Sequence, residues 1–252
     1  MSDEELHRVA NTWRVADVVG AHFETDASRD GAARTLRLRA PGLGTELAGQ
    51  HIDIRLTAPD GYTAQRSYSL ASAEGGDEAE ITVEELADGE VSPYLVRGVQ
   101  PGDQLEVRGP VGGWFVWRPE DPSPVVLIAG GSGIVPLMAM ARRHRALASP
   151  VPFTLLYSVR SPDRVIFHDE LHELAADTRA PFELMLFYTR EAPPETTRAP
   201  GRLTREEVAM AAMDEDVRFF ICGPTAFVET VANRVIDDGF DPDRIKTERF
   251  GG

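Results

Sequence analysis

The chain has 252 residues, 42% of them hydrophobic and 27% charged, which is enough for one large domain or two modest ones. Its 26 Lys and Arg against 41 Asp and Glu give a net charge of −15, which argues against nucleic acid or an anionic membrane surface as the main partner. The single cysteine, Cys222, excludes an internal disulfide and an iron–sulfur cluster held by this chain alone. No apolar run is long enough to cross a membrane and the first residues show no signal-peptide core, so we expect a cytoplasmic protein.

Short apolar or alternating segments, separated by turn residues, occupy the chain from Trp13 to Val116. Turn signals such as Pro59-Asp60-Gly61 punctuate them, and helical periodicity is rare. The pattern predicts a six-stranded antiparallel barrel. The predicted strands are 13–19, 35–40, 51–57, 66–70, 80–86 and 103–108, with one short helix at 92–99.

From residue 124 onward, strand and helix patterns alternate, which predicts a doubly wound parallel sheet of five strands. The first strand is continuously apolar, as expected of a strand buried on both faces. A segment with three prolines, 117–124, marks the boundary, so we predict two domains, 1–118 and 119–252. The predicted strands are 125–129, 153–159, 182–189, 217–222 and 244–250, and the predicted helices are 134–147, 168–175, 205–212 and 225–238.

Two motifs in the first domain carry candidate chemistry. In 66–70 (Arg-Ser-Tyr-Ser-Leu), the two-residue period of a strand places Arg66 and Tyr68 on one face and the serines on the other. In 89–95, a glycine turn leads to Ser92 at a predicted helix N-cap, where free amide groups favour a phosphate. Taken singly, these motifs also fit a strand with an exposed arginine and an ordinary capped helix.

Three further motifs lie in the second domain. Glycines 130, 131 and 133 follow a buried strand and open a helix, the arrangement of a phosphate-binding loop and also of a plain tight turn. Cys222 ends a predicted parallel strand, where ligands of open sheets bind, although a lone cysteine is also a common core residue. The chain closes on 247–252, where the role of Phe250 is open on local grounds.

In this order, the five motifs resemble the ferredoxin–NADP reductase superfamily, most closely the reductase components that serve oxygenases, without a ferredoxin domain. The resemblance implies that Arg66 pairs with the flavin diphosphate, Tyr68 lies on the isoalloxazine ring and Ser69 hydrogen-bonds flavin N5. It further implies that Cys222 positions the nicotinamide for hydride transfer and that Phe250 covers the other flavin face.

The resemblance and the strand ends together define the candidate sites. The catalytic candidates are Tyr68, Ser69, Cys222, Glu248 and Phe250, and we expect no metal. The cofactor-binding candidates are Arg66, Ser67, Tyr68, Ser69, Val83, Glu85, Gly89, Val91, Ser92, Gly131, Ser132, Gly133, Ser158, Arg160, Thr189, Arg190, Arg202, Cys222, Gly223, Pro224 and Phe250.

The identity of both cofactors depends on local residues. No acid follows the second strand of the predicted parallel sheet before Asp163, whereas Arg160, Arg190 and Arg202 supply positive charge, so NADPH is favoured over NADH. Solvated loop arginines are the alternative explanation of that charge. FAD is favoured over FMN, although the loop 73–79 offers no aromatic side chain for an adenine ring.

The expected function is hydride transfer from NADPH to bound FAD, followed by single-electron transfer to a separate protein such as a ferredoxin or an oxygenase component. Free flavin, a quinone or a metal chelate are alternative acceptors, and a non-catalytic flavin-binding or sensor subunit is the alternative from another class. His168 and His172 lack the order of a zinc-binding helix motif and fit a solvated helix start. A basic docking face for the acceptor is possible from Arg29, Arg34, Arg37, Arg39, Arg142, Arg143 and Arg145.

Overall fold

The computed structural model describes residues 11–72, 76–212 and 216–250. The chain forms two compact units, the first made of Met1–Trp117 with Met138–Met140 and the second of Arg118–Leu137 with Ala141–Gly252. Within the described residues, no helix combines the length and the apolar character that crossing a membrane requires.

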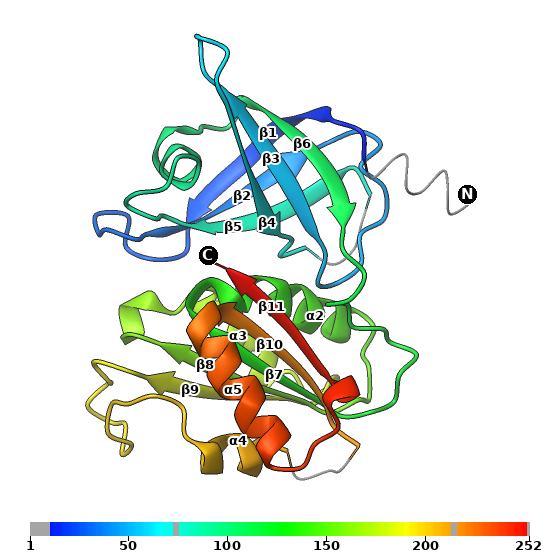
Figure 1. Ribbon diagram of the computed structural model, residues 1–252, viewed down its shortest axis with the longest axis vertical. Helices are drawn as coiled ribbons and strands as arrows, with labels where there is room; N and C mark the ends of the chain where they lie inside the picture. Colours follow the sequence, from blue (N-terminus) through cyan, green and yellow to red (C-terminus); the bar gives the residue numbers. More distant parts are fainter. Residues whose placement is uncertain (1–10, 73–75, 213–215, 251–252) are drawn as a thin grey trace. The chain divides into compact units, whose positions relative to one another are not determined.

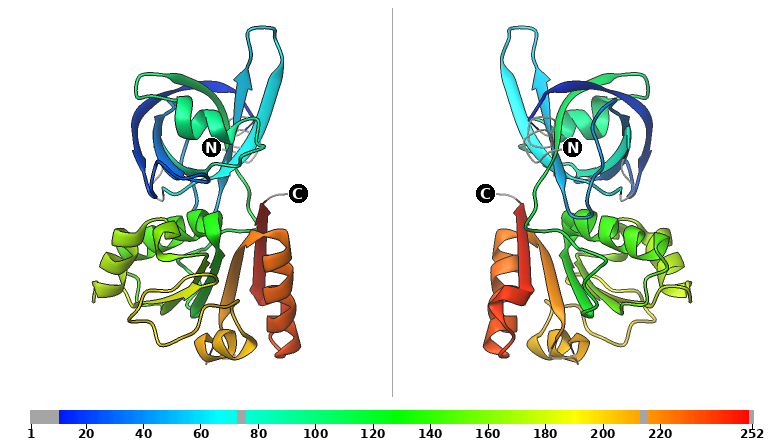
Figure 2. Two further views of the ribbon diagram at one scale, coloured as in Figure 1. Left: turned by 90° about the vertical axis from the view of Figure 1, so that its left-hand side faces the viewer. Right: turned by 90° about the vertical axis from the view of Figure 1, so that its right-hand side faces the viewer.

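The first unit is a six-stranded antiparallel sheet, as the sequence predicts, and its strands lie in the order β4-β3-β6-β1-β2-β5 (Figure 1). The sheet curls into a barrel, because an isolated bridge between Leu70 and Ile81 joins the chain after β4 to β5, the two ends of the strand order (Figure 2). The strands are β1 (Arg14–Phe23), β2 (Ala33–Arg39), β3 (His51–Thr57), β4 (Thr63–Ser69), β5 (Glu78–Glu84) and β6 (Gln104–Val111).

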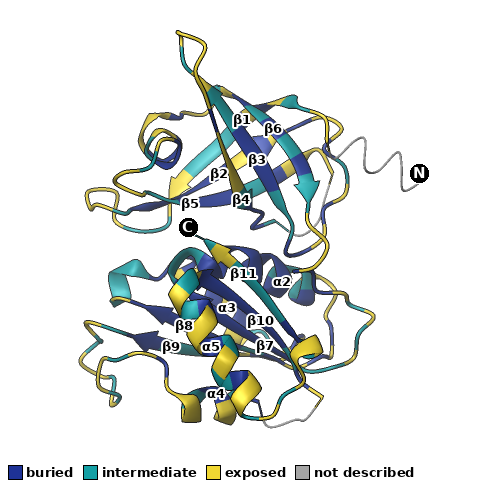
Figure 3. Ribbon diagram, in the orientation of Figure 1, coloured by how far each residue is buried: buried dark blue, intermediate teal, exposed yellow. Residues whose placement is uncertain are grey.

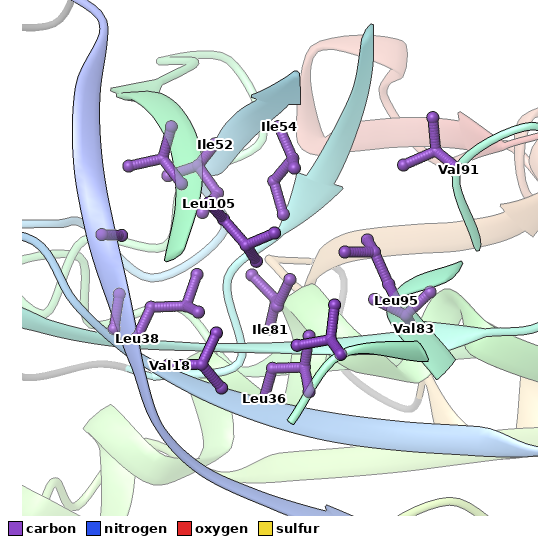
Figure 4. Close-up of a cluster of buried hydrophobic side chains, with 14 of the residues drawn as sticks. Val18, Leu36, Leu38, Ile52, Ile54, Ile81, Val83, Val91, Leu95 and Leu105 are labelled. Carbon is purple, nitrogen blue, oxygen red and sulfur yellow. The ribbon is translucent and has the colours of Figure 1, made fainter. Parts of the chain in front are cut away.

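The barrel core consists of the inward-facing aliphatic residues of these strands. Leu36, Leu38 and Ile81 converge there, and all three are fully buried (Figure 4). The predicted short helix is a π-helical turn, η1 (Tyr94–Gly98), whose Leu95 belongs to the same core. Hydrophobic burial therefore fixes which face of each strand points inward, and with it the direction of the motif-bearing side chains.

The second unit is a five-stranded parallel sheet in the order β11-β10-β7-β8-β9, and the predicted doubly wound arrangement is confirmed. The central strand β7 is buried along its whole length (Figure 3). Helices α4 and α5 share an apolar cluster with one face of the sheet, while α2 and α3 cover the opposite face (Figure 2). The strands are β7 (Val125–Gly130), β8 (Phe153–Val159), β9 (Phe182–Tyr188), β10 (Arg218–Pro224) and β11 (Ile245–Phe250), and the helices are α2 (Ile134–Ala146), α3 (His168–Ala176), α4 (Arg205–Ala211) and α5 (Thr225–Asp237).

Candidate functional site

Strand β4 presents Tyr68 at the surface of the barrel core. The ring of Tyr68 is half-buried against the core cluster, and Ser69, the next residue, is buried. This burial raises the pKa of the Tyr68 phenol to about 12, so the hydroxyl stays protonated at neutral pH. Tyr68 therefore offers a neutral aromatic ring at a fixed place on the barrel.

Ser67 lies on the other face of β4, as the alternation predicts. Its hydroxyl donates a hydrogen bond to Asp53 of the neighbouring strand at 2.6 Å. The second oxygen of that buried carboxylate accepts from Arg108 at 2.5 and 3.1 Å. This hydrogen bond links β4 to β3. The Ser67 hydroxyl is therefore used on the face of β4 opposite to Arg66 and Tyr68.

The segment 86–92 folds back on itself through Ser92. The Ser92 hydroxyl accepts a hydrogen bond from the backbone N–H of Leu86 at 3.1 Å. A Cβ atom on Gly89 would lie 2.7 Å from that hydroxyl oxygen, so a larger residue at this position would displace the Ser92 side chain from its hydrogen bond. The predicted role of Ser92 as a helix cap is wrong, because no side-chain cap hydrogen bond opens η1 and the hydroxyl is used inside the loop instead.

An acidic side chain joins the two barrel motifs. Glu90 accepts a hydrogen bond and ion pair from Arg66 Nη2 at 2.8 Å and a hydrogen bond from the Tyr62 hydroxyl at 2.8 Å. The bond to Glu90 raises the pKa of Tyr62. Sequence reasoning missed both residues, because Tyr62 lies in a turn and Glu90 occupies a position of its motif to which no role was given.

The side chains of Val83 and Glu85 both make contacts within the barrel unit. Val83 is buried in the core, and Glu85 forms an ion pair with Arg97 at 2.6 Å. This guanidinium lowers the pKa of Glu85. The backbone N–H of Glu85 donates to Ala32 at 2.9 Å. Val91 is also a core residue, with only 1% of its surface exposed.

In the second unit, the glycine loop packs against the end of β10. Gly131 adopts a φ of 56°, and a short 3₁₀ turn, η2 (Gly131–Gly133), leads into α2. A Cβ atom on Gly133 would lie 2.1 Å from the carbonyl oxygen of Cys222. Glycine at 133 is therefore required by packing, and the same packing places the N-terminus of α2 beside the carboxyl end of the sheet.

Cys222 is completely buried at the centre of that edge. It is in register with Ala129 of β7 on one side and with Glu248 of β11 on the other. Burial, reinforced by the charge of Glu248, raises the pKa of the Cys222 thiol well above its ordinary value. The thiol is therefore protonated at neutral pH, which fits a positioning role and disfavours nucleophilic attack.

The other predicted residues of this unit gather at the same carboxyl edge. Phe250 is in register with Pro224, next to Gly223, and Gly130 is in register with Ser158. The carboxyl ends of parallel strands meet at one edge of the sheet. These residues therefore approach one another, although Gly130 and Phe250 are 120 positions apart in the sequence.

Three exposed arginines follow the ends of β8 and β9. The backbone N–H of Thr189 donates to Val159 at 2.8 Å, and that of Arg190 donates to Arg160 at 2.9 Å. Gly201 donates to Tyr188 at 2.9 Å, which brings the neighbouring Arg202 back to the end of β9. Across the described ranges, the side chains of Arg160, Arg190 and Arg202 form no ion pair or hydrogen bond.

The arginines suggested as a basic docking face do not form one free surface. Arg34 is buried and donates to the carbonyls of Val96 and Val99 at 3.0 and 2.8 Å, so the prediction is wrong for this residue. Arg142 and Arg145 both pair with Glu170, and Arg39 pairs with Glu78.

For His168 and His172 of α3, the sequence predicts a solvated helix start and no zinc site. The rings of His168 and His172 lie edge to face with centroids 4.5 Å apart, and both side chains are exposed. In the part of the chain that the structure describes, no group of three or more His, Cys, Asp and Glu side chains is placed to hold a metal ion.

Two known family models match this chain, one in its first half and one in its second half. The family model described as an oxidoreductase FAD-binding domain matches residues 22–116. The model described as an oxidoreductase NAD-binding domain matches residues 127–233. The first match lies in the barrel unit and covers Arg66, Tyr68 and Ser92, and the second contains the glycine loop and Cys222.

Individual proteins give a consistent picture. The chain is 33% identical over 204 residues to a flavohemoprotein of Pseudomonas aeruginosa, a match to 81% of this chain and 50% of the relative. It is 33% identical over 209 residues to a glycine betaine monooxygenase reductase subunit of Chromohalobacter salexigens, covering 81% of this chain and 55% of the relative. It thus spans about half the length of the curated relatives it matches.

A solved structure extends the comparison to both units. The ferredoxin NADP+ reductase of Neisseria gonorrhoeae with bound FAD and NADP superposes with a TM-score of 0.78 at 22% identity, over 94% of this chain and 98% of that one. At this identity the superposition compares folds, and the domain models carry the family assignment. With a FAD-binding barrel and an NAD-binding α/β unit, the chain belongs to the ferredoxin–NADP reductase superfamily of oxidoreductases.

Proposed function

We propose that this chain is a reductase that takes hydride from NADPH onto FAD and delivers single electrons to a separate protein acceptor. In this proposal residues 1–118 bind FAD and residues 119–252 bind the nicotinamide nucleotide. The observation that carries it is the arrangement of Arg66, Tyr68 and Ser69 along β4 in one unit together with Cys222 and the glycine loop at the sheet edge of the other.

The barrel residues fit a flavin. The half-exposed guanidinium of Arg66 suits a diphosphate, and the neutral, half-buried ring of Tyr68 suits stacking on an isoalloxazine system. The Ser69 hydroxyl supplies a hydrogen bond at the flavin N5 in this assignment. Bound FAD supplies acceptance of two electrons as hydride and release of electrons one at a time.

The sheet edge fits a nicotinamide nucleotide. The Gly131–Gly133 turn and the N-terminus of α2, a helix of 13 residues, offer backbone N–H groups to a diphosphate. Cys222 keeps its proton, so it limits the position of the nicotinamide without reacting with it. Phe250 covers the flavin face opposite Tyr68 and yields to the nicotinamide in this proposal.

The charge at the ends of β8 and β9 supports NADPH over NADH. Arg160, Arg190 and Arg202 have guanidinium groups that the described chain leaves without ion pairs. A ribose 2′-phosphate is a doubly charged acceptor whose geometry matches such groups. The ribose hydroxyl of NADH would instead call for an acidic side chain at this place.

The nature of the relatives supports a protein acceptor. The matched reductase subunit from Chromohalobacter salexigens is named for a monooxygenase, which favours an oxygenase component or a ferredoxin. The match to a flavohemoprotein favours a haem protein as a second candidate acceptor. In both cases the acceptor takes electrons singly, as a flavin can deliver them.

An acceptor panel tests the proposal. The FAD-loaded chain, supplied with NADPH, is assayed with a ferredoxin, a haem protein, free riboflavin and a quinone at equal concentration. We expect the highest kcat/KM with one of the two proteins and a lower value when NADH replaces NADPH. Fastest reduction of riboflavin or the quinone would contradict the protein acceptor, and no reduction of any acceptor would contradict the reductase.

A further inference from the structure

The loop that follows β9 is folded around one of its own arginines (Figure 1). This loop, residues 189–203, carries Arg190 and Arg202, two of the three exposed arginines that we assign to the 2′-phosphate of NADPH. A third arginine of the same loop, Arg198, differs from them because its side chain is only 25% exposed. The proposed function gives Arg198 no role.

Every N–H group of the Arg198 guanidinium is used within the chain. Nε and Nη2 each donate to the carboxylate of Glu207 on α4, the second at 3.1 Å. The other three N–H groups donate to backbone carbonyl oxygens of the loop, to Ala199 and Gly201 at 3.2 Å each and to Arg202 at 3.0 Å. A guanidinium has five N–H donors, so Arg198 has none left for a phosphate.

Both partners of the Arg198–Glu207 ion pair are held by the folded unit. The guanidinium carbon of Arg198 lies 5.1 Å from the centroid of the ring of Phe187, a buried residue of β9. Glu207 also accepts a hydrogen bond from the backbone N–H of Thr204 at 2.7 Å, in the capping box that begins α4. Burial would raise the pKa of Glu207, but the bonds from Arg198 and Thr204 outweigh it and lower the pKa, so the carboxylate is charged at neutral pH.

These contacts fix the backbone around Arg202. The N–H of the preceding residue, Gly201, donates to the carbonyl oxygen of Tyr188 at 2.9 Å. The following residue, Leu203, is buried in the apolar cluster between the sheet and its helices. The carbonyl oxygen of Arg202 accepts from Arg198, while its side chain is exposed. The fold therefore presents the Arg202 guanidinium from a backbone that is held at three consecutive residues.

We propose that Arg198 is a positioning residue for NADPH, which holds the loop so that Arg202 reaches the ribose 2′-phosphate, and that Arg198 itself does not touch the nucleotide. This inference rests on the proposed function, which assigns the 2′-phosphate to Arg160, Arg190 and Arg202. An arginine loses conformational freedom when it binds a phosphate, and a backbone fixed beforehand lowers that cost. Loss of Arg198 therefore weakens binding only of the nucleotide that carries the 2′-phosphate.

Calorimetric titration of the FAD-loaded full chain with NADP+ and with NAD+ tests the proposal without turnover. Arg198→Met keeps an unbranched side chain over Phe187 and removes all five donors. We expect the Kd for NADP+ to rise about fivefold and the Kd for NAD+ to stay constant. The matched control is Arg205→Met, because Arg205 belongs to the same helix and pairs with Asp238 outside the loop. This control should leave both constants unchanged.

A double-mutant cycle with Arg202 separates positioning from direct binding. Arg202→Ala should raise the Kd for NADP+ about tenfold, because it removes a charged partner of the phosphate. If Arg198 acts through Arg202, the double variant should bind NADP+ as Arg202→Ala alone does. Arg198→Lys can pair with Glu207 but lacks the planar fork, so its Kd should lie between those of wild type and Arg198→Met. If circular dichroism shows that Arg198→Met is unfolded, Arg198→Lys takes its place in the cycle.

The outcomes separate this inference from the proposed function. Effects that multiply to about 50-fold in the double variant would show that Arg198 binds the nucleotide directly, which overturns the positioning role. An equal loss of NADP+ and NAD+ binding in Arg198→Met, or no loss of either, also overturns it. In these cases a selective effect of Arg202→Ala leaves the assignment of NADPH intact. Equal affinity of the wild-type chain for both nucleotides, unchanged in Arg202→Ala, overturns both the assignment and the inference.

Discussion

The arginines of the two candidate sites are held in different ways. In the barrel, Arg66 is paired with Glu90 at 2.8 Å and fixed between two motifs. At the edge of the parallel sheet, Arg160, Arg190 and Arg202 are exposed and, within the described residues, unpaired. A compensated arginine on a strand suits a cofactor that stays bound, because its geometry is preorganised. Uncompensated arginines in loops suit a nucleotide that binds and leaves with each turnover.

The largest expected effect concerns the compensated arginine. Arg66→Ala removes the diphosphate partner and leaves Glu90 with an uncompensated charge, so we expect the Kd for FAD to rise about 100-fold. Fluorescence of flavin released on dilution measures it. Arg39→Ala breaks an exposed pair on the same barrel and is the control. An unchanged Kd in Arg66→Ala would show that Arg66 does not bind the flavin.

The second prediction concerns the packing of the nucleotide loop. Gly133→Ala places a methyl group 2.1 Å from the Cys222 carbonyl oxygen, and we expect a loss of about 2 kcal/mol in the free energy of unfolding. Gly201→Ala, in a position with no atom within 4 Å of the added carbon, should change stability little. Denaturant unfolding of both variants checks the contrast, and equal stabilities would refute the packing argument.

Removing the uncompensated arginines should give a smaller and selective effect. For Arg160→Ala and Arg190→Ala we expect the KM for NADPH to rise about tenfold each and the KM for NADH to stay constant, because only NADPH carries the 2′-phosphate. The control is Arg179→Ala, because this exposed arginine precedes the amino end of β9 and pairs with Asp177. Equal increases for both nucleotides would indicate that these arginines bind the shared part of the molecule.

The smallest effect is a pH dependence of stability. Folding raises the pKa of Cys222. The contribution of the protonated thiol to the free energy of unfolding is therefore fully present below the pKa of an unfolded thiol, about 8.5, and is lost as the pH rises above that value. We expect wild type to lose up to about 1.4 kcal/mol per pH unit more than Cys222→Ala in this window. Unfolding curves between pH 7 and about 9.5 test it, and parallel curves would contradict a buried neutral thiol.

The difference between the two sites also explains what the sequence could reveal. The glycine loop, Cys222 and Phe250 are each placed by a strand end, and strand ends can be recognised from apolar runs followed by turn residues. Parallel topology then brings these ends to one edge without further information. The two sheet classes and the alternation of Arg66 and Ser67 on β4 follow from the same periodicity, whereas the order of the strands in each sheet does not.

The features that escaped prediction depend on pairs distant in sequence. Glu90 meets Arg66 and Tyr62 across 24 and 28 positions, and no local pattern marks such a partner. The sequence suggests Arg34 for an exposed basic docking face, but carbonyl groups of Val96 and Val99, more than 60 positions away, accept its hydrogen bonds inside the barrel. Closure of the barrel creates these contacts, and only the folded chain shows them.

The central claim is that bound FAD receives hydride from NADPH, and anaerobic titration of the purified chain tests it most directly. NADPH, then NADH in a separate titration, is added stepwise while the visible absorbance of the flavin is followed. We predict bleaching of one flavin per equivalent of NADPH and the same bleaching by NADH only at a much higher concentration. A bound flavin that neither nucleotide bleaches would contradict the account.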